Sequence, residues 1–336
     1  MRCLLSLLLL LVFTTPTFAF DPASIGQNTV KEWRAWMKRH GIKEGSLVVA
    51  YEGQIVAKGE VNHTIAEPAK VASLSKAITA VCALKALEAR EMRFSAPLSE
   101  ILPDLLAKYP PKDKRFPDIT VAHLINQTSG ITTRYHRNIE VLRTFQKENK
   151  PWQFSKIVKE GLDGKPGSTP YHYSNANFLT LGLVIESLSG EDYETYCTRE
   201  VLDPAGVKNA RLDDYWTVMS SWGGWEISSE DYLKFAQFWF QGEFSPNRPG
   251  GLFVPTSNIG RGREYGAGMF LRRDGDGYNA WHNGSWRWRG RINDRFGAYV
   301  GLWSNGFSVS TNYAHDAYDG AARKEIDNFL WTTTHP

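Results

Sequence analysis

The alternation of hydrophobic and polar positions divides the chain into a first helix, a hairpin, a long helical middle, late strands and a closing helix. Thr29–Glu32 resembles a capping box, and the apolar stripe behind it predicts a first helix that ends near Gly41. Two short β-rich runs follow at Ser46–Tyr51 and Gln54–Gly59, and the Glu52-Gly53 pair between them predicts a hairpin.

The middle of the chain is predicted to be helical. Apolar residues cover more than one face of residues 73–91, so this helix is expected to be buried. Helices and loops continue to a further helix at Ser229–Phe240. After about residue 264 the period changes to two, which predicts strands, and a closing helix follows at Asp316–Leu330. The late strands are expected at Tyr265–Leu271, Tyr278–Trp281, Trp286–Ile292 and Gly297–Ser304.

Strands at both ends with helices between them indicate one sheet assembled from both termini. We therefore expect an α/β (α+β) fold, in which an antiparallel sheet is flanked by helices and joined to a mostly helical lobe. The sheet lobe would span about residues 20–70 and 262–336, and the helical lobe about residues 71–261.

The first 19 residues are typical of a secretory signal peptide. Arg2 precedes an apolar run at Leu4–Phe13, and Thr17-Phe18-Ala19 resembles a cleavage site. The run is too short to cross a bilayer, and no later stretch is long and apolar enough, so no stable membrane span is expected. The expected mature protein, residues 20–336, is exported and either periplasmic or secreted.

Charge, histidines and cysteines narrow the classes of function. A net charge of +3 is too small to indicate a nucleic-acid partner. The eight histidines show no metal-ligand spacing, so we expect no metal and no other cofactor. Cys82 and Cys197 both lie in helical patterns among apolar neighbours. Export permits a disulfide between them, and two buried free thiols are the alternative.

Ser73-Leu74-Ser75-Lys76 carries the first candidate chemistry. Ser73 and Lys76 are three residues apart at the start of a helical pattern, so their side chains share a face. A serine hydroxyl needs a base to become a good nucleophile, and a lysine with a lowered pKa can serve as that base. Ser75 is adjacent to the lysine and cannot share its face. The alternative is a helix cap followed by a surface lysine.

Two further motifs follow in order. Tyr173-Ser174-Asn175 comes after a Pro-Gly turn, and His282-Asn283-Gly284 lies among the late strands. Together with Ser73 and Lys76, these stretches resemble the serine penicillin-recognising family, which includes class C β-lactamases, D-alanyl-D-alanine carboxypeptidases and related esterases. The resemblance extends over about residues 45–330 and includes accessory stretches at 124–130 and 223–231. It implies a β-lactamase/transpeptidase-like fold.

The resemblance also implies roles for the site residues. Ser73 would be acylated, Lys76 would take its proton, and Tyr173 would act as a general base and return a proton to the leaving group if nearby cations favour its anion. Asn175 would orient Lys76 and bind the substrate amide. Gly284 would let the strand approach the substrate, and the backbone N–H groups of Ser285 and Ser73 would form an oxyanion hole.

The roles of one further tyrosine and of three arginines are left open by the sequence. Tyr171 competes with Tyr173 but has no asparagine two residues later. Arg287, Arg289 and Arg291 alternate with apolar residues and lie either on a solvated strand face or beside the cleft, where an arginine could hold a substrate carboxylate.

The sequence therefore predicts an exported serine hydrolase that forms an acyl-Ser73 intermediate. Its substrate would be a small molecule or peptide: a cell-wall peptide, a β-lactam or an ester. A D-alanyl-D-alanine carboxypeptidase or D-amino-acid peptidase is the first interpretation, and a class C-like β-lactamase or an esterase is the second. His282 replaces the lysine of most true β-lactamases and favours the esterase within that pair. A non-catalytic peptidoglycan or penicillin binder is the interpretation from another class.

Overall fold

The structure is a computed structural model that describes residues 20–131, 150–214, 216–243, 255–275, 277–287, 295–314 and 320–335. The predicted signal peptide lies outside the described residues. In the part of the chain that is described, no helix is long and apolar enough to cross a membrane.

The strands form two antiparallel sheets. The larger sheet has the order β2-β1-β11-β10-β9-β8-β7-β6 and the smaller one the order β3-β5-β4. The strands of the larger sheet are β1 (Glu44–Tyr51), β2 (Gln54–Val61), β6 (Ser257–Gly260), β7 (Arg263–Gly266), β8 (Met269–Asp274), β9 (Gly277–Arg287), β10 (Arg295–Leu302) and β11 (Phe307–Ala314). Those of the smaller sheet are β3 (Ala69–Lys70), β4 (Ala210–Leu212) and β5 (Trp225–Ile227).

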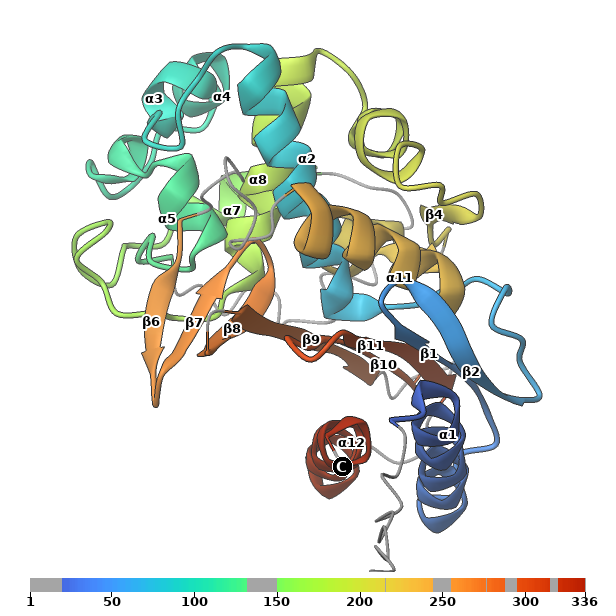
Figure 1. Ribbon diagram of the computed structural model, residues 1–336. Coiled ribbons are helices and arrows are strands. Elements are labelled where there is room, and N and C mark those ends of the chain that lie inside the picture. Colours follow the sequence, from blue (N-terminus) through green and yellow to red (C-terminus); the bar gives the residue numbers. More distant parts are fainter. Residues whose placement is uncertain are drawn as a thin grey trace, which may run out of the picture.

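Helices cover both faces of the larger sheet. Figure 1 shows α1 (Pro22–Arg39) and α12 (Gly320–Thr334) on one face, and α2 (Ser75–Ala89), α8 (Asn175–Ser189) and α11 (Ser229–Ala236) on the other. The remaining α-helices are α3 (Leu98–Ile101), α4 (Pro103–Lys108), α5 (Val121–Ile125), α7 (Lys150–Ile157), α9 (Tyr193–Cys197) and α10 (Ser220–Gly223). The predicted fold class, an antiparallel sheet flanked by helices with many further helices, is confirmed.

Each face of the sheet has its own hydrophobic core. The smaller core joins α1 and α12 to the sheet through rings such as Trp33, Trp36 and Phe329. The larger core surrounds α2, whose residues are almost all buried, as its apolar pattern predicts. Because α2 is enclosed on all sides, a polar residue on it such as Lys76 must lie in the interior.

The first helix begins earlier than the predicted capping box. Asp21 caps α1 by accepting the backbone N–H of Ala23 at 3.0 Å, so the helix starts at Pro22. Thr29 lies in the middle of the helix instead, where its buried hydroxyl donates to the carbonyl of Ile25 at 3.0 Å. The predicted helix boundary at Thr29 is therefore wrong.

The late strands differ from the prediction in their divisions. The single strand predicted at residues 265–271 is divided between β7 and β8. Ala267 and Gly268, with φ angles of 49° and 75°, turn the chain back on itself between them. Residues 277–287 form one continuous strand, β9, where two were expected. The β11 strand was not predicted, and Asp316, the expected start of the closing helix, lies outside the described residues.

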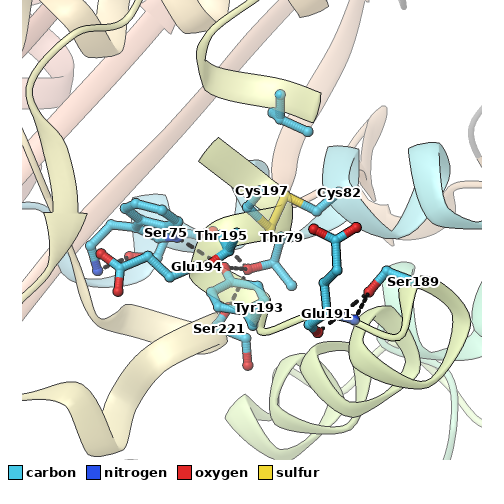
Figure 2. Close-up of a disulfide and its surroundings, with 12 residues drawn as sticks. Ser75, Thr79, Cys82, Ser189, Glu191, Tyr193, Glu194, Thr195, Cys197 and Ser221 are labelled. Carbon is cyan, nitrogen blue, oxygen red and sulfur yellow. Dashed lines mark hydrogen bonds between the residues drawn. A yellow bond between two sulfur atoms is a disulfide. The ribbon is translucent and has the colours of Figure 1, made fainter. Parts of the chain in front are cut away.

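Cys82 and Cys197 form a disulfide, which joins α2 to the end of α9 across 115 residues of sequence (Figure 2). Both residues are fully buried. The choice between a disulfide and two free thiols is thereby settled in favour of the disulfide, and α2 is covalently fixed to the helical part of the fold.

Candidate active site

Ser73 lies on a single helical turn that leads into α2. This turn, η1 (Ala72–Leu74), begins at Ala72, whose φ angle of 46° is rare for a residue other than glycine. Ser73 is partly exposed, whereas Leu74, Ser75 and Lys76 are buried. An uncommon backbone conformation beside an exposed serine is typical of functional sites, where the surrounding structure holds it in place.

Lys76 is fully buried and directs its amine at Ser73. Its Nζ donates to Ser73 Oγ at 3.1 Å and to the carbonyl of Trp222 at 2.7 Å. It makes no ion pair with any described residue. Burial lowers the pKa of Lys76 well below its ordinary value, since the charged form loses its hydration. A neutral amine in this position can accept the proton of Ser73.

The ring of Tyr173 lies close to the amine of Lys76. Its ring centroid is 5.0 Å from Lys76 Nζ. Burial raises the pKa of Tyr173, and a hydrogen bond with Ser73 opposes this effect only in part. Nearby cations would favour the tyrosinate, but burial lowers the pKa of the neighbouring Lys76 amine and so disfavours its charged form. The phenol is therefore protonated at neutral pH, which suits a proton donor to a leaving group better than a base.

Gln127 fixes the backbone on both sides of Tyr173. Its carbonyl accepts the N–H of His172 at 2.9 Å, and its Oε1 accepts the N–H of Ser174 at 2.9 Å. The same Oε1 accepts from the amide of Asn177. Gln127 lies in the stretch 124–130, which was noted only for its resemblance to the family. The structure thus assigns this stretch the task of positioning the tyrosine.

Asn175 and His282 carry buried polar atoms with unused hydrogen-bonding capacity. The Oδ1 of Asn175 and both ring nitrogens of His282 have no hydrogen-bond partner among the described residues. The Lys76 amine donates to Ser73 and to the carbonyl of Trp222. The predicted hydrogen bond between Asn175 and Lys76 does not form in the described structure, because Asn175 Oδ1 has no partner there. Unsatisfied buried groups next to a nucleophile are available to bind a substrate.

His282 belongs to an interior strand of the sheet and is almost fully buried. Its ring stacks on Phe270 at 5.1 Å and lies 6.1 Å from the ring of Tyr173. Burial, and then the nearby Lys76 amine in its protonated form, lower the pKa of His282 to about 3, although a backbone contact with Asn283 acts in the opposite direction. The imidazole is therefore neutral over the physiological range.

Gly284 brings strand β9 against the turn that holds Ser73. A Cβ atom at Gly284 would lie 2.0 Å from the carbonyl oxygen of Val71 and 3.3 Å from the backbone nitrogen of Ser73. Only glycine permits this approach. β9 pairs with β8 as far as Trp281 and with β10 from Ala280 to Arg287. The next residue, Ser285, thus follows the point of closest approach to Ser73, and its oxyanion role stays a prediction.

Two contacts that hold the site together were not predicted from the sequence, and two of the predicted arginines lie where the structure does not test them. The Trp222 carbonyl, next to the Gly223-Gly224 pair, holds Lys76, and Gln127 holds the Tyr173 segment. Neither backbone carbonyl groups nor a lone glutamine give a sequence signal of their own. Tyr171 packs on Tyr265 at 5.3 Å. Arg289 and Arg291 lie outside the described residues.

In the described ranges, no group of three or more histidine, cysteine, aspartate or glutamate side chains is placed to hold a metal ion. At Ser73 the structure brings together a serine hydroxyl, a buried lysine amine and a tyrosine ring. This combination defines a serine hydrolase of the acyl-transfer type.

The chain belongs to the β-lactamase family, because the family model described as Beta-lactamase matches residues 31–306. Among curated relatives, Protein flp of Staphylococcus aureus (strain MW2) is 28% identical over 140 residues, which cover 42% of this chain and 27% of that protein. This chain thus matches less than a third of the length of that relative.

Solved structures share the fold at low sequence identity. A D-stereospecific amidohydrolase from Streptomyces sp. superposes with a TM-score of 0.68 at 18% identity, over 91% of this chain and 98% of that one. EstCE1, described as a hydrolase with promiscuous acyltransferase activity, superposes with a TM-score of 0.70 at 15% identity, over 92% and 99%. The chain is thus a β-lactamase-fold serine hydrolase.

Proposed function

We propose that the protein cleaves amide bonds next to a D-amino acid residue through an acyl-Ser73 intermediate, as a D-alanyl-D-alanine carboxypeptidase or a D-amino-acid peptidase. The observation that carries the catalytic part is the 3.1 Å contact between Ser73 Oγ and the buried amine of Lys76, whose pKa is lowered by burial. The D-amino acid part is supported by the fold shared with a D-stereospecific amidohydrolase.

The reaction uses each residue in turn. Lys76 takes the proton of Ser73 as Oγ attacks the acyl carbon, and Tyr173 delivers a proton to the departing amine. Water then hydrolyses the acyl-enzyme. Asn175 and His282 offer their unpaired polar atoms to the substrate, and the backbone at Ser285 completes the oxyanion site.

A β-lactamase-fold esterase is the second candidate. His282 in place of a lysine and the shared fold with EstCE1 favour it. A class C-like β-lactamase would use the same groups on a lactam.

A comparison of substrates separates these functions. We expect release of D-alanine from a peptide ending in D-Ala-D-Ala, no release from the peptide ending in L-Ala-L-Ala, and loss of the activity in Ser73→Ala. Ser75→Ala is the matched control. Rapid turnover of nitrocefin would favour the β-lactamase, and turnover of p-nitrophenyl esters alone would favour the esterase. A folded protein that cleaves none of these substrates would contradict a catalytic function and favour the non-catalytic binder.

Export is part of the proposal. The Cys82–Cys197 disulfide supports it, since such bonds persist in oxidising compartments. Fractionation of cells that express the full chain should recover the mature protein outside the cytoplasm, with residue 20 as its N-terminus. Recovery of uncleaved protein in the cytoplasm would contradict export without affecting the proposed chemistry.

A further inference from the structure

A concave surface lies on the face of the sheet opposite Ser73, between α12 and strands β7 to β10. It comprises two adjoining cavities of about 300 and 410 Å³ that share Arg263, Trp281, Lys324 and Asp327. We call it the α12 groove. Along β9, Trp281 and Asn283 line the groove, whereas the intervening His282 stacks beside Tyr173 on the other face, as strand alternation requires. The groove therefore opens on the other face of the sheet from Ser73, although Phe270 of its lining stacks on His282 at 5.1 Å.

The α12 groove is strongly cationic. Arg263, Arg272, Arg323 and Lys324 line it, and none of them makes an ion pair with a described residue. The one carboxylate among the described lining residues, Asp327, accepts the hydroxyl of Tyr299 at 2.6 Å. Arg323 and Lys324 also lie near the N-terminus of α12, where the helix dipole disfavours positive charge. Several uncompensated cations in one concavity indicate an anionic ligand.

Three tryptophans give the groove a flat apolar component. Trp281, Trp303 and Trp331 line the 300 Å³ cavity, and the guanidinium of Arg272 lies 5.0 Å from the ring of Trp331. Trp303 is 4% exposed, and its indole N–H has no acceptor among the described residues. The groove thus combines cations, ring faces and an unused buried donor. Asn328 adds an amide group to the lining, whereas the buried amide of Asn279 is already bonded to Asp274 and Ser304.

We infer that the α12 groove binds an acidic saccharide, which is a carbohydrate that carries carboxylate or phosphate groups. The cations would form charge-assisted hydrogen bonds with the acidic groups. The ring of Trp281, which stacks on Phe270 at 5.9 Å, would pack on the apolar face of a sugar ring, and the Trp303 indole N–H and the Asn328 amide would bond hydroxyls. A simple anion would leave the tryptophans unused, and a neutral sugar would leave the cations unused. The inference is independent of the reaction at Ser73.

Calorimetric titration of the full mature chain tests this inference. The probes are a galacturonic acid trimer, its neutral methyl ester, glucose 6-phosphate and glucose. We expect binding of at least one acidic probe, weakened by salt, and at least about tenfold weaker binding of its neutral counterpart. Preference between the trimer and glucose 6-phosphate tells a carboxylate-bearing from a phosphate-bearing ligand.

Variants locate the binding. The double variant Arg272→Ala/Lys324→Ala should bind the acidic probe at least about tenfold more weakly. Lys31→Ala/Arg34→Ala, which removes two exposed cations from α1, should bind like the unmodified protein. Near-ultraviolet circular dichroism checks that both variants are folded. Absence of binding by either acidic probe, equal binding of the neutral probes, or equal loss in both variants would overturn the inference.

Discussion

The amine of Lys76 lies 3.1 Å from the hydroxyl of Ser73, yet the lysine is buried without a carboxylate partner among the described residues. These two facts belong together. The protein interior lowers the pKa of the lysine, and a lysine with a lowered pKa can be the base that the serine requires. The helix α2, apolar around its whole circumference, supplies the burial. The same sequence feature that builds the core thus tunes the candidate site.

Substitutions of Lys76 test whether this residue acts as a base or only lies next to Ser73. Lys76→Met and Lys76→Arg should both slow acylation of Ser73 by about 10²- to 10⁴-fold, because methionine has no base and arginine keeps its proton. The acylation rate of the unmodified protein should rise with pH through the lowered pKa of Lys76. Stopped-flow measurement with a fluorescent penicillin gives these rates. An Arg variant as fast as the unmodified protein would refute the role as base.

The buried lysine also predicts how stability depends on pH. The pKa of Lys76 is lowered in the folded state, so the unfolded chain binds more protons between that pKa and about 10.4. The free energy of unfolding, relative to that of Lys76→Met, should therefore increase as pH rises through this window. Urea denaturation of both proteins at several pH values measures the difference. A difference that stays constant with pH would mean that Lys76 is charged in the folded protein.

Gln127 is predicted to act as a positioning residue for Tyr173. Gln127→Ala removes the acceptor of Ser174 N–H, so the turnover rate should fall about 10- to 100-fold with a smaller change in KM. Gln153→Ala is the matched control, since Gln153 is also buried and donates to the carbonyl of Val218 at 3.0 Å. Gln127→Ala loses two buried side-chain hydrogen bonds and Gln153→Ala loses one, so both variants should be destabilised. Equal activity of the two variants would show that Gln127 is only structural.

Gly284 should tolerate no side chain. In Gly284→Ala the added methyl group would lie 2.0 Å from the carbonyl of Val71, so β9 and the turn that carries Ser73 must separate. We expect loss of measurable acylation in a protein that still folds. Gly161→Ala is the control, because a Cβ there meets nothing within 4 Å. Retained acylation in Gly284→Ala would contradict the close packing of β9 on the site.

The disulfide should contribute to stability rather than to chemistry. Cys82→Ala/Cys197→Ala releases a link across 115 residues, which should lower the free energy of unfolding by about 2–5 kcal/mol. The acylation rate of the folded variant at 25 °C should change little, since both sulfurs are buried away from Ser73. Urea denaturation with and without reducing agent provides the measurement. An unchanged stability would indicate that the cysteines are free thiols.

The sequence predicted the class of fold and the three motifs because both depend on local patterns. The hairpin β1–β2 has its turn at Glu52-Gly53, and α2 has an apolar run with a serine and a lysine at its start. The β11 strand was missed because its Ser308, Ser310 and Asn312 are polar in sequence but buried in the fold. Their partners are distant: Ser308 pairs with Gln237, and Asn312 with Ser46.

The site was predictable in its residue types but not in its connections. The contact from Lys76 to Trp222 spans 146 residues, and Gln127 reaches the Tyr173 segment across 47. The expected bond from Asn175 to Lys76 was replaced by that to the Trp222 carbonyl, a group that every residue possesses and no motif can mark. Burial, which sets the pKa values of Lys76 and Tyr173, is likewise a property of the assembled fold.

The central claim is that Ser73 is the residue that becomes acylated. Incubation with a fluorescent penicillin, followed by intact-mass and peptide-mass spectrometry, tests it most directly. The account predicts one adduct per chain, located on Ser73, present in the unmodified protein and in Ser75→Ala and absent from Ser73→Ala. An adduct on another residue, or one that persists in Ser73→Ala, would contradict it.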